Sequence, residues 1–443
     1  MAACVDLYEL TMGAGYFAQG IHTREAVFQL SVRRLPRNRS FLVTAGLEQA
    51  LHYLTEMRFD AETIRYLRHH ESLRQVPREF FRYLRDFRFS GDVLAVPEGT
   101  LLFPEEPVLF VRAPLIEAQI VETYLLTTLN LQTAIASKAA RMVEAARGRS
   151  VADFGARRAH GPQTGLLAAR GAFIGGCATT SNVLAARALG IPATGTQAHS
   201  WIMAFPDERE AFRTYAEVFP DSCVLLIDTY DTLQGARRAT EIGDKLKGVR
   251  IDSGNLSRLS REVRRILDQA GLKQARIIAS GDLNEWKIDR LLRNGAPIDL
   301  FGVGSELATS RDDPVMAGVY KLVKIGRGRE SAAIKLSSDK VSLPFLKQVR
   351  RRADRNGRFI GDVLCLHGEH LEGEALIRQY MRGGRIIRKL PALPRIRKRA
   401  RRQIECLSPE LRKLADGAEY PVEISRKLRS ASDEAIRKRL LAE

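Results

Sequence analysis

The chain has 443 residues, 45% of them hydrophobic, which allows large cores in two or three domains and excludes a disordered or fibrous protein. Its 70 Lys and Arg against 52 Asp and Glu give a formal net charge of +18, which favours anionic partners such as nucleic acid, phosphorylated metabolites or acidic lipids. Because the sequence has no apolar run of membrane-spanning length, no basic leader and no metal-ligand or C-x-x-C spacing among its five cysteines, we expect a soluble, cytoplasmic protein.

The first 115 residues predict an α+β module. Apolar residues alternate from Ala26 to Val32, which indicates a strand, and Phe41 to Met57 has the apolar spacing of an amphipathic helix. Between Gly91 and Pro114, short apolar runs are broken by Pro and Gly, which is typical of a small β-sheet.

Residues 116–317 predict a barrel-like domain. A long helical stretch over 116–146 is followed by short apolar runs that alternate with helices. The main runs expected to be strands are Val151–Phe154, Cys223–Ile227, Val249–Ile251, Ile277–Ala279 and Leu300–Val303. Repeated strand–helix units imply mostly parallel strands, and an irregular (β/α) barrel, closed or nearly closed, is the usual way to arrange so many.

The remaining residues predict a return to the first module and then a tail. Strand-like alternation resumes after Gly318, in VYKLVKI and SAAIKLSS, so residues 318–392 are expected to join residues 1–115 in one discontinuous α+β sandwich domain. Residues 393–443 are basic, with helical character, and predict a surface helix or tail. The sequence therefore predicts an α/β protein in which the barrel-like domain, 116–317, is flanked by a domain built from both ends of the chain.

Polar residues and glycines follow five of the predicted parallel strands. Because the carboxyl ends of parallel strands face one opening, these residues are expected to line one site. They are Gly155, Arg157 and Arg158; Asp228, Tyr230 and Asp231; Arg250, Asp252 and Ser253; Ser280, Gly281 and Asp282; and Gly302, Gly304 and Ser305.

The residue types at these strand ends favour a phosphorylated sugar as ligand. Glycines beside hydroxyls at Ser280–Asp282 and Gly302–Ser305 let backbone N–H groups approach a phosphate. Asp228 and Asp252 suit ribose hydroxyls or a Mg²⁺ ion on a diphosphate, and the arginines suit carboxylate or phosphate. For each residue alone a structural role is an even alternative, since strand-end aspartates cap helices and G-x-G is a weak motif.

His199, in GTQAHSW, differs from the other histidines because it follows a glycine turn at the end of a short segment between two predicted helices. A neutral imidazole is a good nucleophile toward a phosphoryl group, so His199 is a candidate to carry a phosphate transiently. From spacing alone, a structural histidine remains the more common alternative.

The chain resembles the nicotinate phosphoribosyltransferase family from Asp6 to about Arg350, roughly four fifths of its length. Segments past Ile377 have no recognised counterpart. The motifs that carry the resemblance are DLYELTM (6–12), RRLPRNRSFLVTAGLEQAL (33–51), EAQIVETYLLTTLNLQTAIASKAAR (117–141), DFGARRAHGP (153–162), TTSNVLA (179–185), GTQAHSW (195–201), VRIDSGNL (249–256), FGVGSEL (301–307) and YKLVK (320–324).

This resemblance implies a homodimer with a shared active site that joins nicotinate to phosphoribosyl pyrophosphate (PRPP). It implies release of pyrophosphate, with Mg²⁺ as cofactor, and coupling to ATP hydrolysis through a phosphohistidine at His199. Tyr8 would be an aromatic lid from the partner subunit, and Phe154 would stack on the pyridine ring. The remaining implied site residues surround the substrates: Arg157, Thr196, Ser200 and Arg250 the nicotinate carboxylate and PRPP; Asp228 and Asp252 the ribose or Mg-pyrophosphate; and Ser280, Gly281, Gly304 and Ser305 the 5′-phosphate.

Two alternatives stay open. Within the same class, the alternative base is nicotinamide or another pyridine. The loop Ile174–Asn182 contains no acidic residue to accept an amide N–H, which favours nicotinate. In a different class, Arg378–Arg402 holds eleven Arg or Lys and no acid, which suggests a protein that binds RNA or another polyanion. The segment has only Tyr380 as an interleaved aromatic, so a nucleic-acid function is the less favoured interpretation.

Overall fold

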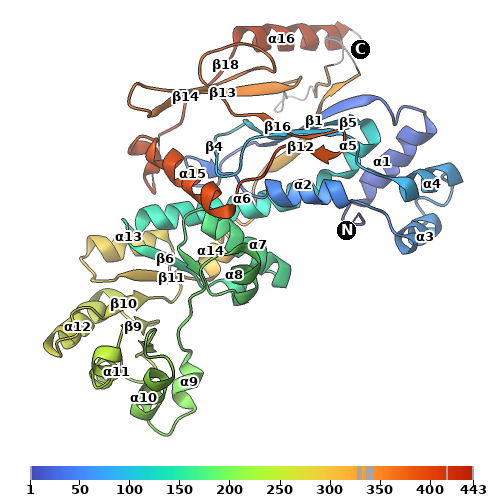
Figure 1. Ribbon diagram of the computed structural model, residues 1–443. Coiled ribbons are helices and arrows are strands. Elements are labelled where there is room, and N and C mark those ends of the chain that lie inside the picture. Colours follow the sequence, from blue (N-terminus) through green and yellow to red (C-terminus); the bar gives the residue numbers. More distant parts are fainter. Residues whose placement is uncertain (1, 327–331, 336–342, 416–417, 442–443) are drawn as a thin grey trace. The chain divides into compact units, whose positions relative to one another are not determined.

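The computed structural model describes residues 2–326, 332–335, 343–415 and 418–441, and it divides into two compact units (Figure 1). One unit comprises Met1–Thr133 and Val315–Glu443, and the other Ala134–Pro314. The N- and C-terminal segments therefore fold together, as expected for a discontinuous domain. The first boundary falls inside a long helix instead of at residue 115, and residues 393–443 belong to the first unit.

The first unit, built from both ends of the chain, combines antiparallel sheets with surface helices. Its helices are α1 (Leu7–Ala18), α2 (Leu47–Glu56), α3 (Ala61–His69), α4 (Arg78–Asp86), α5 (Leu115–Ile120), the first half of α6 (Glu122–Ala145), α15 (Leu393–Glu405) and α16 (Arg426–Leu441). Its strands are β1 (Glu25–Val32), β2 (Leu42–Val43), β3 (Asp92–Ala95), β4 (Leu101–Leu102), β5 (Pro107–Pro114), β12 (Gly318–Ile325), β13 (Lys347–Ala353), β14 (Phe359–Leu366), β15 (Glu374–Ala375), β16 (Arg378–Arg382), β17 (Arg385–Ile386) and β18 (Val422–Ile424).

One antiparallel sheet joins strands from both ends of the chain, in the order β12-β1-β5-β3-β16-β17. The central strand β1 is buried at every residue after Glu25, which accounts for its apolar sequence. A second sheet has the order β15-β13-β14-β18 and is formed entirely by residues after 346. The predicted return of the chain to its first module is confirmed, whereas most of the expected strand SAAIKLSS lies outside the described residues.

Two local predictions in this unit differ from the structure. The helix expected over 41–57 begins only at Leu47, because Leu42 and Val43 pair with β4 and Gly46 adopts φ 105°. That left-handed conformation suits glycine and ends the extended segment. In the C-terminal segment, α15 and α16 are helical as expected, but β18 lies between them and pairs in parallel with β14.

The second unit holds a six-stranded sheet in which every strand pair is parallel. Its strands are β6 (Ser150–Asp153), β7 (Thr179–Thr180), β8 (Val224–Leu226), β9 (Gly248–Ile251), β10 (Arg276–Ala279) and β11 (Leu300–Val303). Its helices after the second half of α6 are α7 (Pro162–Ile174), α8 (Val183–Leu189), α9 (His199–Met203), α10 (Glu208–Val218), α11 (Thr232–Thr240), α12 (Leu256–Gln269), α13 (Glu285–Arg293) and α14 (Ser305–Ala308).

The strand order β7-β6-β11-β10-β9-β8 is that of a barrel opened at one place. Strands β8, β9 and β10 each lie beside the next strand of the chain, β6 lies beside β7, and β11 returns to β6, as in a closed ring. Among the described residues, no strand pairing joins β7 to β8, so the sheet is a curled half-barrel. The barrel-like prediction is confirmed, and the opening falls where the chain inserts α8, α9 and α10. Within the described residues, no helix combines the length and apolar character that crossing a bilayer requires.

Candidate active site

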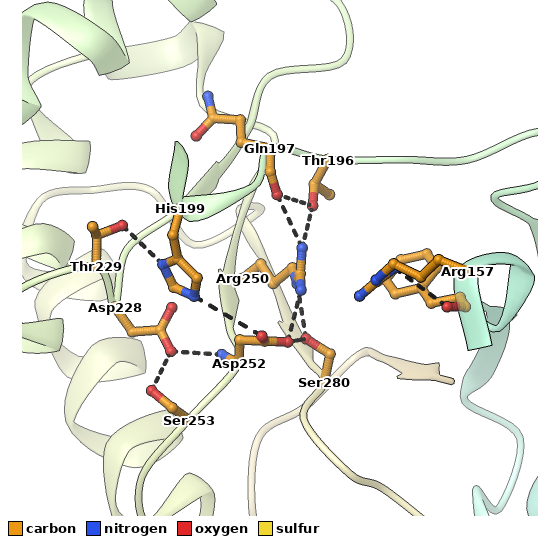
Figure 2. A network of polar contacts seen from close by, with 11 residues as sticks. Arg157, Thr196, Gln197, His199, Asp228, Thr229, Arg250, Asp252, Ser253 and Ser280 are labelled. Atoms are coloured by element: carbon orange, nitrogen blue, oxygen red, sulfur yellow. Dashed lines mark hydrogen bonds and ion pairs between the residues drawn. The ribbon is translucent and has the colours of Figure 1, made fainter. Parts of the chain in front are cut away.

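Polar side chains from the carboxyl ends of β8, β9 and β10 meet the segment 196–199 in one network of polar contacts (Figure 2). The ends of parallel strands bring these residues together, although they are up to 84 positions apart, from Thr196 to Ser280. The network contains the predicted site residues Thr196, His199, Asp228, Arg250, Asp252 and Ser280.

Arg250 lies at the centre of this network and is largely buried. Its Nε donates to Ser280 Oγ at 2.8 Å, and its Nη2 donates to Asp252 Oδ1 at 2.7 Å. Its Nη1 donates to Thr196 Oγ1 and to the Gln197 carbonyl, both at 3.0 Å. A guanidinium has five N–H groups, so these four bonds fix its plane and leave one Nη2 hydrogen for a ligand.

Asp252 links Arg250 to His199. Its Oδ1 also accepts a short hydrogen bond from Ser280 Oγ, and its Oδ2 lies 4.0 Å from His199 Nε2. Partial burial alone would raise the pKa of the Asp252 carboxyl, but the hydrogen bonds from Ser280 and Arg250, with the charges of Arg250 and His199, lower its pKa. Asp252 is therefore a stable anion between Arg250, Ser280 and His199.

His199 is the first residue of the short helix α9, with its side chain 41% exposed. Its Nδ1 lies 3.1 Å from Thr229 Oγ1, the residue directly after Asp228. A hydroxyl at one ring nitrogen fixes the plane of the imidazole and leaves Nε2 directed toward Asp252 (Figure 2). The geometry thus presents one nitrogen of His199 to the network and to solvent.

Asp228, which follows β8, is buried and uses only one of its carboxylate oxygens. Oδ2 accepts from the Asp252 backbone N–H at 2.9 Å and from Ser253 Oγ at 2.6 Å. Oδ1 is also buried and has no hydrogen-bond partner among the described residues. A buried acceptor without a partner is costly, so this oxygen has the capacity to receive a hydroxyl or a cation.

Phe154 and Arg157 lie at the end of β6. The Phe154 ring is nearly buried, and the Arg250 guanidinium carbon lies 5.7 Å from its centroid. Gly302 on β11 has no side chain because a Cβ there would come within 2.4 Å of the Phe154 ring. Arg157 is exposed, and its Nη1 lies 3.4 Å from the Phe154 carbonyl oxygen. The structure therefore places a flat aromatic face beside two guanidinium groups.

The glycines of the predicted phosphate loops lie close to the same residues. Gly281 adopts φ 90°, and a Cβ there would come within 1.9 Å of the Asp252 carbonyl oxygen, so only glycine fits. The Gly304 carbonyl oxygen would lie 3.1 Å from a Cβ at Gly155, and Ser305 begins α14 directly after it. The loops after β10 and β11 thus border the ends of β9 and β6.

Two predicted site residues stand apart from the network. Ser200 is exposed and follows His199 in α9, with no side-chain hydrogen bond recorded in the described structure. Tyr8 belongs to the first unit, on α1, and is 45% exposed. Burial of its hydroxyl and the neighbouring Glu122 carboxylate raise the Tyr8 pKa. A lid function of Tyr8 stays a prediction.

The sequence did not single out two residues that complete the network, Gln197 and Thr229. Gln197 is buried, accepts from Arg250 through its carbonyl, and accepts from the Leu226 N–H at 3.3 Å through Oε1. Thr229 contacts His199, and the predicted strand-end residue Ser253 donates to Asp228. Thr229 directly follows Asp228, so its position next to a strand-end aspartate was the available signal.

Among the described residues, no group of three or more His, Cys, Asp or Glu side chains is arranged to hold a metal ion. Asp228 and Asp252 are the two carboxylates that face the network, and a magnesium ion prefers one or two carboxylates together with phosphate and water oxygens. These two residues therefore suit an ion that arrives with a diphosphate.

Sequence models of one family match most of the chain. The matches are to the nicotinate phosphoribosyltransferase (NAPRTase) N-terminal domain over residues 4–130, the NAPRTase family over residues 149–334 and the nicotinate phosphoribosyltransferase C-terminal domain over residues 369–432. The third match corrects the expectation that the resemblance ends near Arg350 and that the basic C-terminus has no counterpart. Basic surface residues diverge readily while the underlying helices and strands are kept, which hides such a resemblance.

Relatives align over nearly the whole chain. The chain is 47% identical to nicotinate phosphoribosyltransferase pncB2 of Mycobacterium tuberculosis, over 96% of this chain and 91% of that protein. It is 40% identical to nicotinate phosphoribosyltransferase of Bacillus subtilis, over 85% of this chain and 78% of the relative.

Solved structures share the same arrangement of elements. Human nicotinic acid phosphoribosyltransferase aligns with a TM-score of 0.86 at 28% identity, over 97% of this chain and 99% of that one. A nicotinate-nucleotide pyrophosphorylase from Pyrococcus furiosus aligns with a TM-score of 0.76 at 26% identity, over 91% of this chain and 95% of the other.

Proposed function

The chain belongs to the nicotinate phosphoribosyltransferase family, and from this premise we propose how its strand-end network performs the reaction. It is an enzyme of NAD biosynthesis that transfers the phosphoribosyl group of PRPP to nicotinate. The observation that carries the proposed mechanism is the hydrogen-bonded group of Arg250, Asp252 and Ser280 at the ends of parallel strands, with His199 Nε2 4.0 Å from Asp252 Oδ2.

Nicotinate binds against the Phe154 ring, with its carboxylate toward the guanidinium groups. Arg250 lies 5.7 Å from the ring centroid and has one N–H group left for a ligand, and the exposed Arg157 side chain lies next to the Phe154 carbonyl. An aromatic face with arginines at its edge suits a flat aromatic acid. The hydroxyls of Thr196 and Ser200 lie on the segment that borders Arg250.

The transfer forms a bond between the pyridine nitrogen and ribose C1′ and breaks the bond from C1′ to pyrophosphate. The pyridine lone pair makes the new bond, and the electron pair of the broken bond leaves with pyrophosphate, so no proton has to be removed. Positive charge develops on the ribose, and the anions Asp228 and Asp252 stabilise it. The loops at Ser280, Gly281, Gly304 and Ser305 hold the 5′-phosphate. The Ser280 N–H donates to the Ile251 carbonyl, so the backbone donors of this proposal are the N–H groups of Gly281, Gly304 and Ser305.

Magnesium fits this site as a companion of the diphosphate. Asp228, with its buried and unpartnered Oδ1, and Asp252 are the residues that would hold it or its water ligands. When bound, the ion neutralises charge on the departing pyrophosphate.

His199 takes the γ-phosphoryl group of ATP. Its Nε2 lone pair attacks the γ-phosphorus, the bond to the bridging oxygen breaks, and ADP leaves; water later cleaves the N–P bond and releases phosphate. The attack needs the proton of the imidazole on Nδ1, where the N–H can donate a hydrogen bond to Thr229 Oγ1 at 3.1 Å. A phosphoryl group at Nε2 would lie near both the Asp252 anion and the Arg250 cation, so phosphorylation would reorganise the network that binds PRPP.

The enzyme acts in the cytoplasm as a homodimer in which Tyr8 covers the partner's active site. The exposed apolar side chains of Leu7, Tyr8 and Met12 on α1 support a surface covered by a second chain. Nicotinamide is the alternative base, and the absence of acidic residues between Ile174 and Asn182 argues against it.

Polyanion binding by the basic C-terminal segment is the alternative from another class, and its contacts favour a role in the fold. Arg399 donates to the Glu98 carbonyl, while Arg378 and Arg401 pair with Glu374 and Glu405. Ile396, Ala400 and Ile404 bury one face of α15.

The test is to incubate the protein with PRPP and Mg²⁺, with either nicotinate or nicotinamide, in the presence and absence of ATP, and to identify the mononucleotide. We expect nicotinate mononucleotide, and more of it per unit time with ATP. His199→Ala should abolish ATP stimulation and ATPase activity while slow ATP-independent transfer continues. Unchanged ATPase activity in that variant would contradict the phosphohistidine, and formation of nicotinamide mononucleotide alone would contradict the base preference.

A further inference from the structure

A buried cluster of charged residues lies in the second unit, apart from the network described above. Lys138, in the second half of α6, has a side chain with no exposed surface. Its Nζ lies 2.7 Å from Glu285 Oε2, 3.0 Å from Asp312 Oδ1 and 3.8 Å from Glu306 Oε2. One ammonium group therefore contacts three carboxylates from three segments of the chain.

Two arginines complete this cluster. Arg141, one helical turn after Lys138, donates from Nε to Glu285 Oε1 at 3.0 Å, and its guanidinium carbon lies 5.5 Å from the Trp286 ring. Arg311 Nη1 lies 3.7 Å from Glu306 Oε1. Three cations thus face three anions, and this balance makes burial of Lys138 tolerable.

The carboxylates that Lys138 contacts begin the helices behind the predicted phosphate loops. Glu285 is the first residue of α13, which follows the loop of Ser280 and Gly281 after β10. Glu306 is the second residue of α14, which follows Gly304 after β11. Strands β10 and β11 are paired neighbours, so the two loops lie side by side. Lys138 Nζ therefore contacts the first turns of both α13 and α14, through Glu285 and Glu306.

We propose that Lys138 is a positioning residue, which fixes the spacing between the loops after β10 and β11 through Glu285 and Glu306. The inference rests on the proposed function, which assigns these loops to the 5′-phosphate of PRPP. Lys138 is fully buried and does not contact substrate; it acts through the backbone of the two loops. Its effect should be larger on PRPP than on nicotinate, because the supported loops themselves are assigned to the 5′-phosphate. They reach the nicotinate residues indirectly, through the Ser280 bond to Arg250 and the packing of Gly302 on Phe154.

The experiment compares steady-state constants of wild type and Lys138→Met. We expect the KM for PRPP to rise about tenfold, since small displacements of binding groups are costly, while the KM for nicotinate changes less than about twofold. Removing one partner of a buried ion pair also destabilises the fold. Two further variants therefore accompany it: Glu306→Gln, whose carboxylate is 16% exposed, and the double variant Lys138→Met with Glu285→Gln.

The double variant separates positioning from stability. It removes a buried negative charge together with the positive one, so its melting temperature should recover toward wild type, while its KM for PRPP should remain raised because the bridge is absent. Arg147→Met is the matched control, since Arg147 follows α6 and pairs with Asp289 further along α13, at 2.7 Å, on a more exposed face. This control should leave both KM values unchanged.

The outcomes distinguish the two levels of inference. A wild-type protein that forms no nicotinate mononucleotide from PRPP contradicts the proposed function, and the inference falls with it. If wild type is active and the folded variants keep the wild-type KM for PRPP, the inference alone is wrong. It is also wrong if KM for PRPP and KM for nicotinate rise together, or if the KM for PRPP returns to normal as soon as stability does.

Discussion

Two arginine–aspartate pairs of this chain have the same contact chemistry and different surroundings. In the first unit, Arg351 Nη2 lies 2.6 Å from Asp362 Oδ2, and the two side chains are 1% and 0% exposed. In the second unit, Arg250 Nη2 lies 2.7 Å from Asp252 Oδ1, and the exposures are 11% and 29%. The distances are nearly equal, so the difference lies in the exposure of the two pairs and in the residues around them.

Arg351 is surrounded by the fold itself. Its guanidinium donates to the Leu101 carbonyl and to Gln403, and its carbon lies 4.8 Å from the Phe359 ring centroid. Asp362 also accepts from the Tyr420 hydroxyl at 2.9 Å. In contrast, Asp252 Oδ2 and one N–H of Arg250 remain available beside the half-exposed His199. An ion pair that the fold encloses on all sides stabilises the fold, whereas one that borders solvent can also bind a ligand.

Arg351→Met should produce the largest effect, on stability. It leaves Asp362 buried beside Glu106 without its cation, and loss of one partner of a buried pair costs about 3–5 kcal/mol. Chemical denaturation should show this loss, while kcat/KM per folded molecule stays within about twofold. Arg352→Met, which removes the more exposed pair with Glu423, should cost less than about 1 kcal/mol. Equal losses of unfolding free energy in Arg351→Met and Arg352→Met would contradict a special structural role of the buried pair.

Arg250→Met should lower activity much more than it lowers stability. Loss of a preorganised charged donor at the reacting centre lowers kcat/KM by about 10²–10³-fold, while stability falls by only about 1–3 kcal/mol because Asp252 keeps Ser280 and partial solvation. Arg250→Lys should recover part of the charge effect and little of the fork geometry. A variant with wild-type kcat/KM would show that Arg250 belongs to the fold, as Arg351 does.

Gly281→Ala should have an intermediate effect on both properties. A Cβ would come within 1.9 Å of the Asp252 carbonyl oxygen at φ 90°, so the loop must shift, with strain of about 1–3 kcal/mol and a raised KM for PRPP. Gly295→Ala is its control, because Gly295 has φ 67° and open space around it. The control should lose stability from backbone strain with no change in KM.

Glu106→Gln tests how the free energy of unfolding depends on pH through the buried group of Glu106, Arg351 and Asp362. Burial, followed by the Asp362 charge, raises the pKa of Glu106 well above its usual value. Its favourable contribution is therefore present below the unfolded pKa, about 4.3, and is lost as pH rises toward the folded pKa. We expect the stability of Glu106→Gln relative to wild type to increase from pH 5 to pH 8 in denaturant unfolding. A constant difference would contradict a raised pKa.

The opposite sign applies to Asp252, whose pKa is lowered despite partial burial, chiefly by Ser280 and Arg250. Its contribution is present above the unfolded pKa, about 3.9, and is lost as pH falls through the lower folded value. Ser280→Ala removes one of these donors and should move the acid limb of kcat/KM slightly upward. This is the smallest effect we expect, and an acid limb that moves downward would contradict it.

The sequence was sufficient for those parts of the molecule that depend on local pattern. Period-two and strand–helix alternation predicted β1, β12 and five of the six strands of the parallel sheet, all but β7. The rule that strand ends share one edge brought Asp228, Arg250 and Ser280 together. Side-chain directions in irregular segments have no such period. The contacts of Gln197 and Thr229 therefore required coordinates.

Pairings between distant segments were equally hidden. β18 is three residues long and pairs with β14, nearly 60 positions earlier. Lys138 reads as an ordinary helix residue, and only the fold shows that it meets Glu285 and Glu306. The helix predicted over 41–57 begins later, at Leu47, for the same reason. Leu42 pairs with the distant Leu102 in a sheet, and this pairing outweighs the helical spacing of the apolar residues.

β7 and β8 are the two edge strands of the parallel sheet, and the chain between them, which carries His199, can move without breaking a strand pairing. The segment that leads to it is anchored to the sheet through backbone bonds of Thr180 with Pro192 and Thr194, and through Gln197. A shift of residues 195–203 would break the hydrogen bonds of Thr196, Gln197, His199 and Trp201 while leaving every strand pairing from β8 to β7 intact. The parallel sheet can therefore stay rigid while the short segment that carries His199 moves, so a change at this histidine need not disturb the strands behind it.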